Sequence, residues 1–162
     1  MCEAYPETGG LIERGNVVRN YAWVDKTGAS RELCDLSNGE NRLAFIVYGS
    51  VTCLTCQHEA ADLAELRREY RDRGVVAVQW LVDAESVEQL EKWPGASLDY
   101  ALGFVRPNPE QVMDDCQEAD ECEFAHVLPH HFIVDLRTMK VVAPNCHVYT
   151  KDEWAKCLAP FL

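Results

Sequence analysis

The sequence lacks any long apolar segment. No run of about 18 or more apolar residues occurs among its 162 residues, so none has the length of a membrane-spanning helix. Polar low-complexity stretches and internal repeats are also missing, so we expect a single domain. Basic residues are few, because 15 Lys and Arg stand against 27 Asp and Glu and give a net charge of -12. A surface this acidic repels a phosphate backbone, so nucleic acid is not an expected partner.

Cysteine, in contrast, is plentiful. Eight cysteines are many for a reduced cytosolic chain, and their scatter does not match the spacing of metal fingers. We therefore expect an oxidising compartment. The eight are Cys2, Cys34, Cys53, Cys56, Cys116, Cys122, Cys146 and Cys157.

The first 17 residues are rich in Gly, Pro and Glu and lack periodicity, which predicts a flexible N-terminal tether. The domain is expected to span residues 18–162. Met1-Cys2 before a polar segment resembles a trimmed bacterial lipoprotein, in which Cys2 would carry the lipid. A disulfide from Cys2 to Cys34 or Cys146, or a chance cysteine in a flexible terminus, is the alternative.

The centre of the sequence has the pattern of a strand, a helix and a second strand. Residues 43–48 are apolar enough for a strand buried on both faces, and residues 75–82 repeat this pattern. Between them, apolar residues recur at intervals of three and four over residues 58–73, and Gly74 provides a stop signal. This order predicts a right-handed parallel crossover.

Cys53-Leu54-Thr55-Cys56 lies at the junction between the first of these strands and the helix. A cysteine in the first helical turn meets unpaired backbone N–H groups and the positive end of the helix dipole, which stabilise its thiolate. A second cysteine one turn later can close a disulfide with it. This placement indicates redox chemistry.

The remaining elements are shorter. Sequence patterns predict a hairpin around the turn 25–29, a helix over 84–92 capped by Asp83, and a strand at about 98–104. They also predict a helix with Asn108 as its cap and Pro109 at its first position, running to about Cys116. A second hairpin joins 131–135 to 140–143, and a capping box at Thr150 starts a last helix.

Three features together resemble the thioredoxin superfamily, and within it the extracytoplasmic TlpA-like and ResA-like oxidoreductases. They are the strand leading into Cys53-Leu54-Thr55-Cys56, the crossover to Val82-Asp83, and the segment Val127-Leu128-Pro129-His130-His131-Phe132-Ile133-Val134-Asp135. The resemblance implies an α/β thioredoxin-like three-layer fold, with a central mixed sheet flanked by helices and an N-terminal β-hairpin extension. It covers the chain from about residue 18 to its end.

The resemblance also implies an activity, thiol-disulfide exchange with protein substrates. Cys53 would be the attacking thiolate and Cys56 the resolving cysteine. Leu128 and Pro129 would bind substrate, since the family proline that matches Pro129 has a cis peptide bond and lies against the active-site disulfide. No cofactor beyond this disulfide is implied. We expect disulfide-containing or dithiol-containing protein partners, an upstream redox partner, a monomeric state, and a periplasmic or membrane-tethered location.

The sequence departs from the family pattern near the cysteines. Thr52 stands where the family usually has tryptophan, no proline lies between the cysteines, and the preceding strand lacks the buried aspartate of thioredoxins. Another carboxylate or water must then handle the proton of the exchange. Glu59 is a nearby candidate, although its place on a helix predicts a solvated side chain.

Two other functions fit the same residues. Cys53, Cys56 and His126 could bind copper or zinc, as in the Sco-like copper-delivery proteins of this fold, and His130 and His131 lie near the same loop. A thioredoxin-fold binding domain without turnover is the third possibility. Cys116 and Cys122 could form a local disulfide that exchanges with the active pair, whereas the sequence leaves the pairing of Cys34, Cys146 and Cys157 open.

Overall fold

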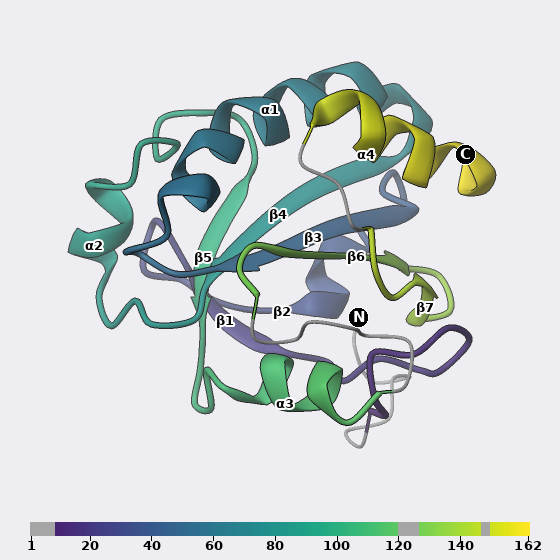
Figure 1. The fold of residues 1–162 in the computed structure, drawn as a ribbon, viewed down its shortest axis with the longest axis horizontal. Coiled ribbons are helices and arrows are strands. Elements are labelled where there is room, and N and C mark those ends of the chain that lie inside the picture. The colour runs from purple at the N-terminus through teal and green to yellow at the C-terminus, as the bar shows by residue number, and fades with distance from the viewer. Residues whose placement is uncertain (1–8, 120–126, 147–149) are drawn as a thin grey trace.

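The computed structural model describes residues 9–119, 127–146 and 150–162. In this part of the chain, seven strands form one mixed sheet in the order β2-β1-β5-β4-β3-β6-β7 (Figure 1). The strands are β1 (Ala22–Asp25), β2 (Ser30–Glu32), β3 (Leu43–Gly49), β4 (Val75–Leu81), β5 (Ala101–Val105), β6 (His130–Asp135) and β7 (Lys140–Ala143).

Helices lie on both faces of this sheet. As Figure 1 shows, α1 and α4 run side by side over one face, while α3 covers the other. The helices are α1 (Leu54–Tyr70), α2 (Val87–Glu91), α3 (Gln111–Gln117) and α4 (Lys151–Leu158). Short 3-10 turns lie at Leu33–Leu36, Arg71–Arg73 and Ala159–Phe161. The three layers are helices, sheet and helix.

The predicted central crossover is confirmed. β3 and β4 are parallel and in register from Leu43↔Val75 to Gly49↔Leu81, and every residue of both strands is buried. Burial on both faces explains why these strands are continuously apolar instead of alternating. Gly74 ends the helical segment with a φ of 77°, a left-handed conformation that glycine adopts without a steric penalty.

The N-terminal hairpin is also confirmed. β1 and β2 pair antiparallel on either side of the predicted turn, where Gly28 has a φ of 82°. β1 then pairs antiparallel with β5, which attaches the hairpin to the sheet. At the opposite edge, β6 and β7 form the second predicted hairpin.

Residues 9–17, which we expected to belong to a flexible tether, pack onto the domain. Ile12 is fully buried and its N–H donates to the Asp115 carbonyl over 2.9 Å, while Val17 bridges to Lys140 of β7. An apolar side chain with this degree of burial holds its segment in place. The packed domain therefore extends further toward the N-terminus than the boundary we placed at residue 18.

Two predicted helix starts were wrong. Ser86, not Asp83, caps α2, because its Oγ accepts from the Gln89 N–H and Gln89 completes a capping box. α3 begins at Gln111, after Asn108 has used its side chain to accept from the Glu110 N–H. β5 also starts at Ala101, three residues later than predicted. In the described part of the chain, no helix is both long and apolar enough to cross a membrane.

Candidate active site

Cys53 and Cys56 form a disulfide at the N-terminus of α1, just after the turn that connects β3 to this helix. Cys53 is the N-cap residue, and its Sγ accepts a hydrogen bond of 3.1 Å from the Cys56 N–H. Its sulfur therefore occupies the position where a helix start stabilises negative charge. Cys53 is partly exposed, whereas Cys56 is fully buried.

Asp83 stabilises the turn between β3 and Cys53. It follows β4, whose C-terminal end lies beside that of β3, and its carboxylate accepts from the Ser50 hydroxyl at 2.6 Å and from the Val51 N–H at 2.8 Å. Ser50 Oγ in turn accepts from the Thr52 N–H. Asp83, predicted as a helix cap, thus fixes the approach to the cysteines instead.

Buried neighbours hold Cys56. A Cβ atom at Gly49 would lie 2.7 Å from the Cys56 sulfur, so only glycine fits at the end of β3. Gln79, fully buried on β4, donates from Nε2 to the Cys56 carbonyl over 3.0 Å. Its Oε1 accepts from the Trp93 indole and the Tyr100 hydroxyl, so all three polar groups are satisfied.

Pro129 has the cis peptide bond that the resemblance implied, after Leu128. The next residue, His130, pairs with Tyr48 in the antiparallel β3–β6 ladder. Continuing that register by one residue brings Pro129 beside Gly49, which itself abuts Cys56. The pairing of β3 with β6 therefore places Leu128 and Pro129 close to the disulfide.

Glu59 is not solvated, contrary to the expectation from its helix. It is 3% exposed, and its Oε2 lies 3.1 Å from Nε2 of His131, which is 4% exposed. Glu59 lies four residues before Leu63 and seven before Leu66, both fully buried, so helical spacing places it on the face toward the sheet. That spacing was the signal available in the sequence.

The two adjacent histidines lie on opposite faces of the sheet, as alternation along a strand requires. His131 lies on the α1 face with Glu59, whereas the His130 ring stacks on Tyr48 and lies 3.5 Å from the Cys116 sulfur on the α3 face. The third histidine of the metal hypothesis, His126, lies outside the described residues. Within those residues, no group of three or more His, Cys, Asp and Glu side chains is arranged to hold a metal ion.

Comparison with known proteins gives a match only in structure. No protein-family model matches the sequence, and no curated protein does. Among solved structures, the thioredoxin domain of a thiol-disulfide oxidoreductase from Bacteroides vulgatus superposes with a TM-score of 0.68 at 16% identity, covering 91% of this chain and 96% of that one. A thiol:disulfide interchange protein from Bacteroides sp. gives 0.64 at 17%, covering 91% and 89%.

A secreted disulfide oxidoreductase of Mycobacterium tuberculosis, described as homologous to Escherichia coli DsbE, gives a TM-score of 0.60 at 13% identity, covering 88% and 96%. The chain has a thioredoxin-like fold. The fold class predicted from the sequence, including the mixed sheet between helices, is thereby confirmed.

The other described cysteines of this thioredoxin-like domain are also in disulfides. Cys146 and Cys157 bridge the segment after β7 to α4, away from the Cys53–Cys56 pair in the sequence and on a different helix. Cys34 and Cys116 are disulfide-bonded as well. Cys2 and Cys122 lie outside the described residues, so the Cys116–Cys122 pairing and the lipid at Cys2 stay predictions.

Two large apolar side chains are exposed in the described part of the chain, and both lie next to site residues. Leu54, between the two cysteines, is 70% exposed, and Val127, two residues before Pro129, is 50% exposed. Exposed apolar side chains next to a functional group are typical of a surface that contacts another molecule.

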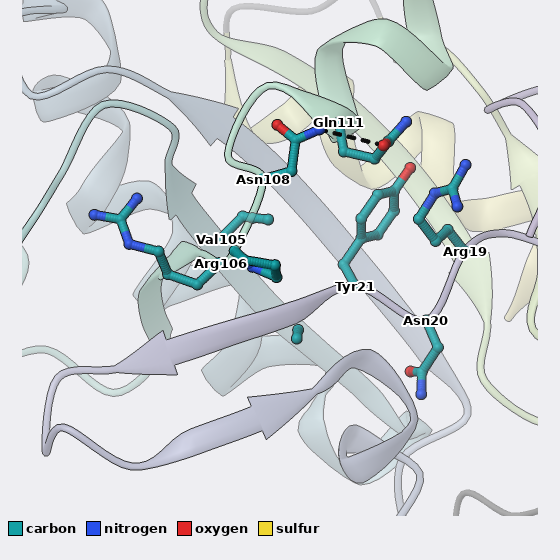
Figure 2. Close-up of a pocket in the computed structure, with 9 residues that line it drawn as sticks. Arg19, Asn20, Tyr21, Val105, Arg106, Asn108 and Gln111 are labelled. Carbon is teal, nitrogen blue, oxygen red and sulfur yellow. Dashed lines mark hydrogen bonds between the residues drawn. The ribbon is translucent and has the colours of Figure 1, made fainter. Parts of the chain in front are cut away.

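A polar pocket on the α3 side differs from the disulfide site. It has a volume of about 270 Å³ and lies between β1, the end of β5 and the start of α3. Figure 2 shows Arg19, Tyr21 and Gln111 gathered at one end, whereas the Arg106 side chain points away from them. Arg106 donates to the Ala84 carbonyl and Arg19 is paired with Asp115, so the two arginines do not converge on one ligand position.

Proposed function

We propose that this protein is a thiol-disulfide oxidoreductase that exchanges its Cys53–Cys56 pair with protein substrates. The observation that carries the proposal is the asymmetry of the pair. Cys53 is accessible at the start of a helix, and Cys56 is fully buried beside Gly49. An accessible sulfur can attack or be attacked, while a buried sulfur one turn away can close the intramolecular disulfide.

In the reducing direction, the Cys53 thiolate attacks one sulfur of a substrate disulfide and forms a mixed disulfide. Cys56 then loses its proton and attacks the Cys53 sulfur, which restores the Cys53–Cys56 bond and releases the second substrate sulfur as a thiolate. The substrate gains two electrons and the cysteine pair loses two. A dithiol partner protein returns the pair to its reduced form.

The buried Cys56 needs a group to take its proton, because water does not reach it directly. Glu59 lies one helical turn further along α1 on the same buried face. Side chains three residues apart on a helix are neighbours, about 5–6 Å between their Cβ atoms. We assign to Glu59 the role that a strand aspartate plays in thioredoxins, which this sequence lacks.

Leu128 and Pro129 are the proposed substrate-binding residues. The loop before β6 ends beside the disulfide, and we expect its backbone to pair with an extended substrate segment. Leu54 and Val127 supply apolar contact on either side. The favoured substrate is therefore an extended segment with apolar residues next to its disulfide.

An extracytoplasmic location accompanies this activity. Six cysteines lie in the described part of the chain and none of them is free. Disulfides of this number persist in oxidising compartments. A periplasmic or membrane-tethered enzyme, with a lipid on Cys2 as its tether, would meet substrates and an upstream dithiol partner there, and we propose that it acts as a monomer.

The test is reduction of insulin disulfides by wild type, Cys53→Ser and Cys56→Ser, with copper and zinc measured in the purified proteins. We expect turnover by wild type only, and accumulation of a covalent substrate adduct by Cys56→Ser, because resolution of the mixed disulfide needs Cys56. A double variant of Cys146→Ser and Cys157→Ser is the matched control and should keep its turnover.

Two outcomes would overturn the proposal. Absence of turnover together with a stoichiometric metal that is lost in His126→Ala would favour a copper-binding or zinc-binding protein. Absence of both turnover and metal would favour a binding domain without catalysis.

A further inference from the structure

Glu59 and His131 form an isolated polar pair in an apolar layer. The His131 ring packs against Phe45 of β3 and Trp154 of α4, with ring centroids 6.0 and 5.3 Å away. Lys151, the cation of α4 nearest along the chain, pairs with Glu65 and Glu69 further along α1. Among the described residues, His131 is therefore the hydrogen-bonding partner of the Glu59 carboxylate.

The Glu59 carboxylate is satisfied on one side only. Oε2 is 3.1 Å from His131 Nε2, whereas Oε1 is buried and has no hydrogen-bond partner among the described residues. Burying a polar atom without a partner costs free energy, and a catalytic role is one explanation for such an atom. The unpaired oxygen, Oε1, is able to accept a proton.

Cys56 lies in the same core layer, between the sheet and α1, as the two aromatic residues that pack against His131, Phe45 and Trp154. Helical side chains lean toward the N-terminus of their helix, which directs Glu59 back toward the turn that holds Cys56. His131, the second residue of β6, is two residues after Pro129, and alternation along an extended chain places both on one face, about 7 Å apart. The helix and the strand thus bring the pair to Cys56 from both sides.

We propose that His131 is a positioning residue that holds Glu59 ready to accept the Cys56 proton and thereby sets the pH range of exchange. This inference deepens the proposed function and rests on it. The Nε2–H of His131 donates to Oε2 and leaves Oε1 free. As the mixed disulfide resolves, the Cys56 S–H bond breaks and an O–H bond forms at Oε1, while the Cys56 sulfur displaces the substrate sulfur from Cys53.

His131 is needed because of what the carboxylate would do without it. A carboxylate buried with no donor takes up a proton itself, and a protonated Glu59 cannot accept one from Cys56. The donor on Oε2 stabilises the ionised form and also fixes the rotation of the carboxylate. Loss of the donor should therefore slow resolution at neutral pH and move the rise of the rate to higher pH.

The experiment is single-turnover reduction of a disulfide peptide by the dithiothreitol-reduced protein over a pH series, with separate rates for adduct formation at Cys53 and its resolution by Cys56. The variants are His131→Phe, which keeps an aromatic ring of similar size, His131→Gln, which keeps an N–H donor, and Glu59→Gln. Glu65→Gln, at a half-exposed carboxylate on the same helix, is the matched control.

We expect His131→Phe to slow resolution about tenfold or more at neutral pH, within the range of general acid–base effects, and to shift its pH profile upward by about one unit. His131→Gln should restore most of the neutral rate. Glu59→Gln should slow resolution as well, and adding His131→Phe to it should slow it no further. Adduct formation at Cys53 should stay unchanged in all of them.

A packing role for His131 predicts the opposite order, with His131→Phe at least as fast as His131→Gln, and that result would overturn the inference. Equal resolution rates in all variants would also overturn it while leaving the exchange activity standing. Absence of exchange in the wild type would instead remove the proposed function. Should His131→Phe not fold, His131→Leu, which also removes the N–H donor, is compared with His131→Gln in its place.

Discussion

Glu59 and Asp115 are both buried carboxylates, 3% and 4% exposed, and they lie on opposite faces of the sheet. Both oxygens of Asp115 are occupied. Oδ2 accepts from Arg19 Nε at 2.9 Å and from the Tyr21 hydroxyl at 2.7 Å, while Oδ1 accepts from Arg19 and from Gln111. Glu59 has one hydrogen-bond partner, at Oε2, and its Oε1 has none among the described residues. Asp115 thus has the complete hydrogen bonding expected of a structural carboxylate, whereas Glu59 keeps one oxygen able to accept a further hydrogen.

The donors around Asp115 also keep their protons over a wide pH range. Burial raises the pKa of Tyr21, and the charge of Asp115 raises it further. The hydrogen bond to Asp115 raises the pKa of Arg19. Tyr21 and Arg19 therefore keep their protons at neutral pH and hold α3 to the N-terminal segment as permanent donors.

Replacement of the two carboxylates should separate stability from catalysis. Asp115→Asn is expected to lower the free energy of unfolding by about 3 kcal/mol, because it leaves Arg19 without its charge partner and turns an amide N–H₂ toward other donors. Glu59→Gln should cost about 1 kcal/mol or less, since it loses a single hydrogen bond. Urea unfolding measures both.

Exchange activity completes this test. Folded Asp115→Asn should reduce insulin at the wild-type rate, whereas Glu59→Gln should be slower. Similar losses of stability in the two variants, or a loss of activity in folded Asp115→Asn, would show that hydrogen-bond completeness does not distinguish the two roles.

Gln79 tests whether complete hydrogen bonding or closeness to the disulfide determines if a buried polar residue is structural or catalytic. Its side chain is fully hydrogen-bonded, yet it lies beside Cys56. Gln79→Met, of similar volume, should cost about 2 kcal/mol, since the Trp93 and Tyr100 donors would lose their buried acceptor. Thermal or urea unfolding measures the loss. Gln117→Met, on the exposed side of α3, should change stability by no more than about 0.5 kcal/mol. A cost at Gln79 as small as that at Gln117 would contradict the structural role.

The strand, helix and cysteine placement could be predicted from the sequence because each rests on local signals. The apolar runs of β3 and β4 and the spacing of Leu63 and Leu66 record burial directly. The capping box at Thr150 is equally local and is present. The cis bond at Pro129 came from the family resemblance, not from local signals.

The partners of buried polar groups could not be predicted in this way. Glu59 and His131 are 72 residues apart, and Asp115 and Tyr21 are 94 apart, so tertiary packing alone brings them together. A polar Gln79 in the middle of an apolar strand and a Glu59 in phase with Leu63 were visible as exceptions. The hydrogen-bond partners of these two polar side chains depend on the strand order.

Asp25 provides the smallest and most local contrast, a carboxylate at the hairpin turn whose donors are all nearby in sequence. It accepts from Thr27, Ala29 and Arg31. Partial burial would raise its pKa, but these hydrogen bonds outweigh that effect and lower the pKa from 3.8 to about 2. Because the folded-state pKa lies below the unfolded one, the stabilisation is complete above about pH 4 and is lost as the pH falls toward 2.

Asp25→Asn should therefore cost about 1 kcal/mol at neutral pH, less than the full pKa shift would give, since the Arg31 side chain is 49% exposed and solvent screens the pair. The difference between Asp25→Asn and wild type in urea unfolding should shrink between pH 4 and pH 2. Asp35→Asn, an exposed carboxylate in the next turn, is the comparison variant. A difference that persists unchanged at pH 2 would mean that the turn is stabilised by its backbone geometry and not by the charge of Asp25.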